Sequence, residues 1–283
     1  MFLDCAGRTL DLSRPRVMGI LNVTPDSFSD GGRYLGTDAA IRHAEGLIDQ
    51  GAAIIDVGGE STRPGAEAVP LQQELDRVVP VVERISAAFD IPISVDTSKA
   101  EVMTAAAAAG AGMLNDVNAL RAANALPAAA ATGLPVCLMH MQGEPRTMQA
   151  APQYADVVAD ILSYLGERLA ICERAGLNRN RLLVDPGFGF GKTLRHNLEL
   201  LRDLQRFEQL GVPVLVGISR KSMLGALTGR PVDERLAGSL AAAVLAVERG
   251  ARIIRVHDVA ATVDALKIWQ AVADIDSAAP EDD

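Results

Sequence analysis

MGILNVTPDSFSDGG, residues 18–32, is the stretch around which the rest of the chain is organised. It continues an apolar run, residues 17–21, that is too short for a helix and lies between Pro15 and Pro25. Such a run predicts a buried strand. Polar and turn-forming residues follow at once, and the pattern becomes helical from Thr37. The stretch therefore predicts one βα unit, made of a buried strand, a polar loop and a helix.

The same unit repeats along the chain. Apolar runs predict further strands near residues 53–57, 91–95, 112–114, 135–139, 181–184, 212–217 and 251–256. Helical patterns follow near residues 38–50, 71–89, 99–109, 122–131, 154–175, 194–210, 234–249 and 259–272. Eight strands alternating with eight helices, in roughly the ~250 residues typical of that fold, favour a single-domain (β/α)8 TIM barrel. An open doubly wound sheet is the alternative, because its strands are also buried on both faces.

The two ends of the chain differ from the repeat. Residues 1–15 show alternating apolar residues around Gly7, which predicts a short hairpin that closes the amino-terminal mouth of the barrel. We expect the barrel to span residues 16–273. Residues 274–283 form a short acidic stretch with a proline, and we interpret them as a frayed tail.

Composition excludes several classes of protein. Of the 283 residues, 49% are apolar, which is enough for a sizeable core. The net charge of −9 argues against general nucleic-acid binding. Cys5, Cys137 and Cys172 lie far apart and form no CxxC pair, so neither a disulfide framework nor a zinc cluster is predicted. With no apolar run of membrane-spanning length and no signal pattern, we expect a cytoplasmic protein without membrane association.

Almost every predicted strand ends in a residue that is able to bind or catalyse: Asn22, Glu60, Asp96, Asn115, His140, Asp185, Ser219, and Arg255 with His257. In a (β/α)8 barrel these ends converge on one face, where active sites form. A single Asp, Asn or Ser after a strand could equally cap the next helix. Caps do not require Arg, Lys or His, however, so the whole series favours a site.

The residue types indicate two kinds of chemistry. Carboxylates and an amide suit a flat heterocycle rich in N–H donors, and Asp96, Asn115 and Asp185 provide them. A basic set suits a phosphate or diphosphate: Arg63, Lys221, Arg255 and His257. A transition-metal cluster is not predicted, because only four His exist and two of them lie in helical patterns.

The segment DPGFGFGKT, residues 185–193, resembles a phosphate-binding GxxxxGK[ST] loop, but Pro186 occupies the position of its first glycine. It does not match GxGxxG either, since Lys192 replaces the last glycine. We expect its glycines to let the backbone approach a planar ligand, with Phe188 or Phe190 as an apolar wall.

Eight motifs in order resemble the signature of bacterial dihydropteroate synthases: MGILNVTPDSFSDGG, DVGGESTRPG, SVDTSK, LNDV, LMHMQG, DPGFGFGK, GISRKS and IIRVHDV. The resemblance extends from about residue 16 to 272. It implies an enzyme of folate synthesis that condenses (7,8-dihydropterin-6-yl)methyl diphosphate with 4-aminobenzoate, giving 7,8-dihydropteroate and diphosphate. It also implies a homodimer, a Mg2+ cofactor and inhibition by sulfonamides that mimic aminobenzoate.

The resemblance assigns roles residue by residue. It implies that the pterin is bound by Thr62, Asp96, Asn115, Asp185, Lys221 and Arg255. The aminobenzoate slot would be bordered by Phe28, Arg63, Pro64, Phe190, Ser219 and Lys221. The diphosphate would be bound by Asn22, Arg63, Arg255 and His257, with Asn22 also ligating Mg2+. The catalytic set would be Arg63, Lys221, Arg255 and His257.

The expected reaction is a dissociative substitution, because a diphosphate leaves readily once its charge is neutralised and the carbon left behind is allylic to an electron-rich ring. Two other functions stay open at this point. The chain could be the pterin-binding domain of a methyltransferase, although the SRKS and RVH motifs have no evident use there. It could also be an idle paralogue that binds pterin without condensing it.

Overall fold

Eight parallel strands close into a barrel in the computed structural model, which describes residues 1–24, 33–61, 65–66, 68–144 and 147–275. The strands are β3 (Arg16–Asn22), β4 (Ile54–Gly58), β5 (Ile93–Asp96), β6 (Met113–Asp116), β7 (Val136–Met139), β8 (Leu182–Asp185), β9 (Val214–Val216) and β10 (Ala251–Val256). β10 pairs with β3, which joins the two edges of the sheet. The TIM barrel is thus confirmed, and the open doubly wound sheet is excluded.

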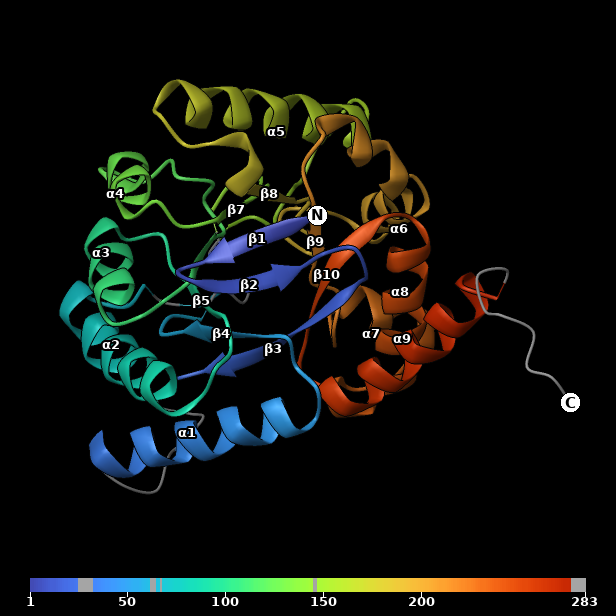
Figure 1. Cartoon of the computed structure of the whole chain (residues 1–283). Helices are drawn as coiled ribbons and strands as arrows, with labels where there is room; N and C mark the ends of the chain where they lie inside the picture. Colours follow the sequence, from blue (N-terminus) through green and yellow to red (C-terminus); the bar gives the residue numbers. More distant parts are fainter. Residues whose placement is uncertain (25–32, 62–64, 67, 145–146, 276–283) are drawn as a thin grey trace, which may run out of the picture.

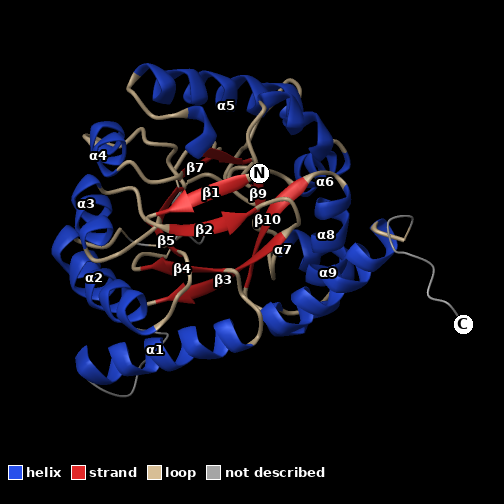
Figure 2. Ribbon diagram, viewed as in Figure 1, coloured by secondary structure: helices blue, strands red, loops and turns tan. Residues whose placement is uncertain are grey.

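Helices surround the barrel on its outside (Figure 1 and Figure 2). They are α1 (Arg33–Asp49), α2 (Leu71–Ala88), α3 (Ala100–Ala108), α4 (Ala125–Thr132), α5 (Val157–Arg174), α6 (Leu194–Arg202), α7 (Ser222–Thr228), α8 (Leu236–Glu248) and α9 (Val259–Ala273). Their buried apolar side chains and the outward-facing side chains of the strands form one large core. Within the described part of the chain, none of the helices is both long and apolar enough to cross a membrane.

An antiparallel hairpin, β1 (Phe2–Cys5) and β2 (Arg8–Asp11), covers the amino-terminal end of the barrel (Figure 1). Leu3, Cys5 and Leu10 pack with side chains from near the starts of the barrel strands, such as Met18 and Ile54. These side chains form a second core inside the barrel, separate from the outer one. The predicted hairpin and its position are therefore confirmed, while the division at residues 15 and 273 stays a prediction.

The structure departs from the sequence analysis in four helical regions. α1 begins at Arg33 instead of near Thr37. The helix predicted over residues 194–210 is two elements, because α6 stops at Arg202 and a 3-10 helix, η3 (Leu204–Leu210), follows. The buried residues of η3 are Leu204, Phe207 and Leu210, and their spacing of three matches the three residues per turn of a 3-10 helix.

Helix α7 was not predicted at all. It has seven residues, SMLGALT, and it ends at Gly229, whose φ of +70° is the left-handed conformation that terminates helices. An element this short shows too few turns for a helical period to be recognised. A further 3-10 turn, η4 (Val232–Glu234), precedes α8 where one helix from residue 234 was expected. Of the predicted tail, residues 274–283, the part from residue 276 lies outside the described residues.

Candidate active site

Most of the polar residues that end the strands lie together at the carboxyl-terminal end of the barrel. The register places Gly58 beside Asp96, and Asp96 beside Asn115, on neighbouring strands. Asp185 ends β8 opposite Met139 of β7. Because parallel strands of a barrel point the same way, their last residues share one rim, as the sequence analysis expected.

The side chain of Arg255 connects two carboxylates of the barrel, those of Asp56 and Asp96. Its Nε donates to Oδ2 of Asp56 at 2.6 Å, and its Nη2 donates to Oδ2 of Asp96 at 3.0 Å. The Nδ2 atom of Asn115 also donates to Oδ2 of Asp56, at 3.4 Å. Burial opposes the charge on Arg255, but Asp56 and Asp96 more than compensate, so its pKa is raised. The guanidinium is therefore a fixed cation, held across the barrel by two carboxylates.

Asp56 is the functional residue that the sequence analysis missed. It lies in the middle of β4, in IIDVG, and is fully buried. A carboxylate is almost never fully buried unless it is paired. An aspartate inside an apolar run was thus the available signal, and it would have predicted a buried cationic partner.

Asp96 has one carboxylate oxygen to spare. Its Oδ2 accepts from Arg255, whereas its buried Oδ1 has no hydrogen-bond partner among the described residues. Burial raises the pKa of Asp96 to about 7, against the lowering effect of Arg255 and with further raising by Asp56. A buried polar atom without a partner is costly, so a ligand that donates an N–H here would be bound favourably.

Asp185, at the end of β8, and Lys221, after β9, are close enough for the charge of each to affect the pKa of the other. The Oδ1 atom of Asp185 accepts from the backbone N–H of Gly187 at 2.7 Å. Burial raises the pKa of Asp185, and the nearby charge of Lys221 partly offsets that rise. Burial lowers the pKa of Lys221 to about 8, with Asp185 acting in the opposite direction. The Lys221 ammonium donates to the carbonyl of Phe188 and lies 4.5 Å from the ring centroid of Phe190.

The glycines of the segment after β8 have a different use from the one we expected. A Cβ on Gly187 would lie 1.9 Å from the carbonyl oxygen of His140, and one on Gly191 would lie 2.4 Å from that of Gln142. Both glycines also have positive φ, +72° and +59°. Gly187 and Gly191 let this segment pack against the chain that follows β7, while the approach of a ligand to the remaining glycines stays a prediction. Phe188 is fully buried in the outer core and cannot be a ligand wall, whereas Phe190 is half-buried beneath Lys221.

Ser219 and His257 connect the ends of β9 and β10. The Oγ atom of Ser219 lies 3.1 Å from Nδ1 of His257, and the backbone N–H of His257 donates to the same Oγ at 3.2 Å. With Lys221 and Arg255, these residues give this side of the rim its hydrogen-bond donors and positive charge. The arrangement suits an anion, as the sequence predicted.

Asn22 lies near Asp96, separated by Gly58. A Cβ on Gly58 would lie 3.7 Å from Oδ1 of Asn22 and 3.6 Å from Cβ of Asp96. No cluster of three or more His, Cys, Asp or Glu that could hold a metal ion exists among the described residues. A Mg2+ ion usually keeps several waters and binds through few protein oxygens plus substrate phosphates. The single amide oxygen of Asn22 fits an ion that arrives with a diphosphate.

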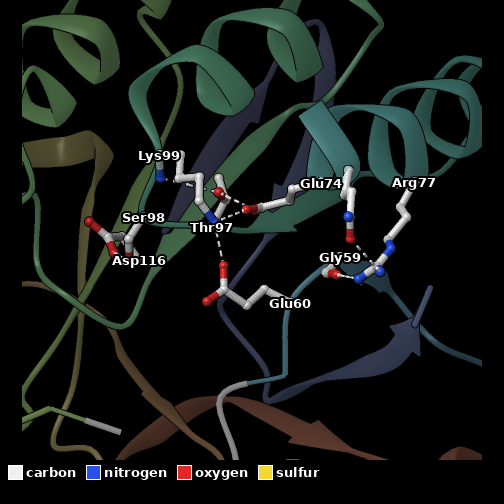
Figure 3. Close-up of polar contacts among 9 residues, drawn as sticks. Gly59, Glu60, Glu74, Arg77, Thr97, Ser98, Lys99 and Asp116 are labelled. Atoms are coloured by element: carbon white, nitrogen blue, oxygen red, sulfur yellow. Dashed lines mark hydrogen bonds and ion pairs between the residues drawn. The ribbon is translucent and has the colours of Figure 1, made fainter. Parts of the chain in front are cut away.

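Two other residues of the strand-end series are held by neighbouring charged side chains. Glu60 pairs with the Lys99 ammonium, which also binds Glu74, and Thr97 donates to Glu74 at 2.5 Å (Figure 3). His140 lies with its Nδ1 3.1 Å from Nζ of Lys192, which also donates to loop carbonyls, and burial lowers the pKa of His140 to about 2. His140 is therefore neutral.

A cleft of about 660 Å³ opens beside Asp96. It extends over Thr97 and Ser98 at the end of β5, Asn118 after β6 and Met141 after β7. The cleft thus gives access to the rim from the side of β5–β7. The remaining predicted site residues, Phe28, Thr62, Arg63 and Pro64, lie outside the described residues.

Comparison with known proteins gives a consistent result. Residues 18–257 match the family model described as pterin binding enzyme. The dihydropteroate synthase of Haemophilus influenzae is 55% identical over 273 residues, covering 96% of this chain and 99% of that protein. The enzyme of Escherichia coli K12 is 57% identical over 271 residues, covering 96% of each chain.

Solved structures agree in fold as well as in sequence. Yersinia pestis dihydropteroate synthase in a sulfonamide drug complex has a TM-score of 0.92 and 55% identity, covering 96% of this chain and 99% of that one. The Xanthomonas albilineans enzyme with 4-aminobenzoic acid has a TM-score of 0.91 and 58% identity, covering 96% and 98%. The same enzyme in complex with 7,8-dihydropteroate has a TM-score of 0.88 and 55% identity, covering 96% and 99%.

Proposed function

Because the chain belongs to the dihydropteroate synthase family, we propose that the carboxyl-terminal rim of its barrel condenses the dihydropterin diphosphate with 4-aminobenzoate. The reaction gives 7,8-dihydropteroate, a folate precursor, and diphosphate. The observation that carries the assignment of residues is that two opposite chemistries meet at this rim. Carboxylates and an amide lie at or near the ends of β5, β6 and β8, cations follow β9 or lie near the end of β10, and Arg255, one of these cations, is bonded to the carboxylates of Asp56 and Asp96.

The carboxylate side is where we place the pterin. Asp185 keeps one oxygen on the Gly187 N–H, which leaves the other for a ligand, and Asp96 has a buried Oδ1 ready to accept. Asn115 adds an amide between them, and Thr62 is expected to complete the set. A pterin presents an amidine-like edge of N–H donors and ring nitrogens that carboxylate and amide groups match. Arg255 and Lys221 border the same space.

The cationic side is where we place the diphosphate and its Mg2+. Asn22 would hold the ion, and His257, Arg255 and Arg63 would bind the diphosphate oxygens. When bound, Mg2+ would supply neutralising charge to the diphosphate. Arg255 contributes in the same direction, because Asp56 and Asp96 fix its guanidinium before the substrate arrives.

We propose a dissociative path for the substitution. Preorganised cations stabilise charge that grows on the diphosphate as the C–O bond breaks. The dihydropterin ring stabilises the carbon left behind, and the weak aminobenzoate nitrogen attacks afterwards. We expect aminobenzoate, and sulfonamides that mimic it, to lie against Phe190 with Ser219 and Lys221 near the carboxylate, and with Phe28, Arg63 and Pro64 closing the slot. The Yersinia pestis relative was solved with a sulfonamide drug.

The experiment that tests the function is an assay of product. The purified protein with both substrates and Mg2+ should form 7,8-dihydropteroate and release one diphosphate per product. A protein that binds pterin but forms no product would be an idle paralogue, and one that transfers methyl groups would be a methyltransferase domain. The path is tested with bridge-labelled [18O]diphosphate substrate in the absence of aminobenzoate. Scrambling of the label supports early C–O cleavage, whereas its absence under conditions of normal turnover contradicts it.

The raised pKa of Asp96 predicts a proton linkage. The free enzyme holds a proton on Asp96 up to pH of about 7, whereas a pterin N–H is best accepted by the carboxylate. Pterin binding at pH 6 should therefore release a proton, and the affinity should fall as the pH drops below about 7. Calorimetry at pH 6 in two buffers of different ionisation enthalpy measures the release. Asp96→Asn should abolish it, and an unchanged release in that variant would remove Asp96 from this role.

We also propose that the enzyme is a cytoplasmic homodimer. The exposed apolar side chains on neighbouring helices α6, α7 and α8 and on η4 support a face that pairs with a second copy: Leu194, Leu198, Leu227, Val232, Leu236 and Leu245. Cys5, Cys137 and Cys172 are free and buried, which suits a reducing compartment.

If this face forms the dimer, negative charges placed on it should prevent dimerisation. The double variant L227E/L236E should sediment as a monomer, because carboxylates on both helices would be buried on pairing. Ile268→Glu is the matched control, since Ile268 is 70% exposed on α9, a helix that is not part of the proposed face, and should leave the dimer intact. A dimeric double variant would place the interface elsewhere.

A further inference from the structure

Arg220 lies between two proposed site residues, Ser219 and Lys221, and has an unusual backbone. Its φ of +57° is the left-handed conformation, which residues with a side chain rarely adopt. Strain of this kind persists only where the surroundings enforce it, and it is concentrated at functional sites. No role has been given to Arg220 so far, although it belongs to the SRKS motif.

Three contacts hold Arg220 in place. Its guanidinium binds both carboxylate oxygens of Asp258, with Nε 2.9 Å from Oδ2 and Nη2 donating to Oδ1. Its backbone N–H donates to Oγ of Ser239 at 3.0 Å, and its carbonyl accepts from Nη1 of Arg235 at 3.0 Å. Both Ser239 and Arg235 belong to the start of α8 or precede it directly. The left-handed turn is therefore fixed from the side chain and from both backbone groups.

Asp258 follows His257 directly, so the ion pair joins the segment after β9 to the segment after β10. A second link, between Ser219 and His257, runs alongside it. The Asp258 side chain makes no capping hydrogen bond to α9, which begins at the next residue. Its interaction with Arg220 is thus separate from the start of that helix.

The solvent exposure of the Arg220–Asp258 pair indicates how much it contributes to the stability of the fold. The side chains of Arg220 and Asp258 are 36% and 20% exposed, and ion pairs this accessible add little to stability. A two-pronged contact between a guanidinium and a carboxylate does, however, fix orientation as well as distance. Loss of this ion pair should therefore change the positions of neighbouring residues more than the free energy of unfolding.

We infer that the Arg220–Asp258 ion pair is a clamp that sets the position of Ser219 and Lys221 relative to Arg255 and His257. Arg220 and Asp258 are then positioning residues for the condensation, and neither needs to touch the substrate. This inference rests on the proposed placement of those four residues at the site. Asp96 on β5 and Asp185 on β8, the carboxylates that we place against the pterin, lie outside the two segments that the ion pair joins.

A double-mutant cycle tests the clamp. In Arg220→Ala and in Asp258→Ala, kcat should fall and the KM for aminobenzoate should rise, each by about 10-fold, since small displacements of reacting groups are costly. The affinity for pterin should fall less than the KM for aminobenzoate rises, because Asp96 and Asp185 are untouched while Lys221 and Arg255, which also border the pterin, are displaced. The double variant should be no worse than the poorer single variant, because both changes remove the same contact. Losses that multiply in the double variant would overturn the inference.

Two further variants make the outcome specific. Arg220→Lys keeps the positive charge but not the two-pronged guanidinium contact, so it should recover only part of the kcat and KM that Arg220→Ala loses. Arg230→Ala breaks the exposed Arg230–Glu234 pair nearby and should leave the kinetics unchanged. A clamp that merely stabilised the fold would lower the melting temperature and the active fraction without moving KM, which would also overturn the inference.

Lys221→Met separates this inference from the proposed site. If Lys221→Met keeps normal kinetics, the placement of the site itself is wrong. If Lys221→Met loses activity while the variants at Arg220 and Asp258 behave as wild type, the site stands and the clamp fails.

Discussion

Arg255→Met should lower the free energy of unfolding by about 3–5 kcal/mol, because it leaves the buried carboxylate of Asp56 without its cation. Asp56 is fully buried and its Oδ2 lies 2.6 Å from Nε of Arg255. Its other oxygen has no hydrogen-bond partner among the described residues, so the carboxylate has little other compensation. Urea unfolding at pH 7.5 measures the change.

The same variant should lose about 10²–10³-fold in kcat, as expected when one preorganised cationic donor to the leaving group is removed. Stability and activity can be separated with a second change. In Asp56→Asn/Arg255→Met the uncompensated charge is gone, so part of the stability should return while kcat stays low. Recovery of both would mean that Arg255 acts only by balancing Asp56. An unchanged free energy of unfolding in Arg255→Met would contradict the pairing itself.

Asp185→Asn should weaken pterin binding by about 2–4 kcal/mol. The Gly187 N–H, 2.7 Å from Oδ1, determines the orientation of the new amide. The amide must turn its oxygen toward that N–H, so its NH2 group faces the N–H donors of the pterin. Donor then opposes donor where a carboxylate accepted before, and charge is lost as well.

Calorimetric titration with a pterin that lacks the diphosphate measures this loss. Thr193→Ala is a suitable control, since Thr193 follows the same segment and caps α6 through the His196 N–H without reaching the rim. It should lower thermal stability slightly and leave pterin affinity unchanged. A wild-type affinity in Asp185→Asn would remove Asp185 from the pterin site.

The fold could be predicted because its information is local. Each βα unit shows an apolar run followed by a helical period, and eight such units leave few architectures. The boundaries that failed are those where local information is weak. η3 has the spacing of a 3-10 helix within a continuous apolar pattern, and α7 is too short to show a period.

The rim could be predicted in part, because the ends of parallel strands converge whatever the packing between them. Asp96, Asn115, Asp185 and Arg255 were found this way. Sequence order does not show which strand-end residues find partners beside the rim, as Glu60 does with Lys99 and His140 with Lys192. Nor does it show contacts across the barrel, and the pairing of Asp56 with Arg255, 199 positions apart, became visible only in the structure.

The central claim is that one rim binds the two halves of one substrate with opposite chemistries. A crossed titration of wild type, Asp185→Asn and His257→Gln, each with a pterin alone and with inorganic diphosphate plus Mg2+, tests it most directly. We predict that Asp185→Asn loses affinity for the pterin and keeps affinity for diphosphate, while His257→Gln shows the reverse. Equal losses of both ligands in either variant would contradict the division of the rim into a carboxylate side and a cationic side.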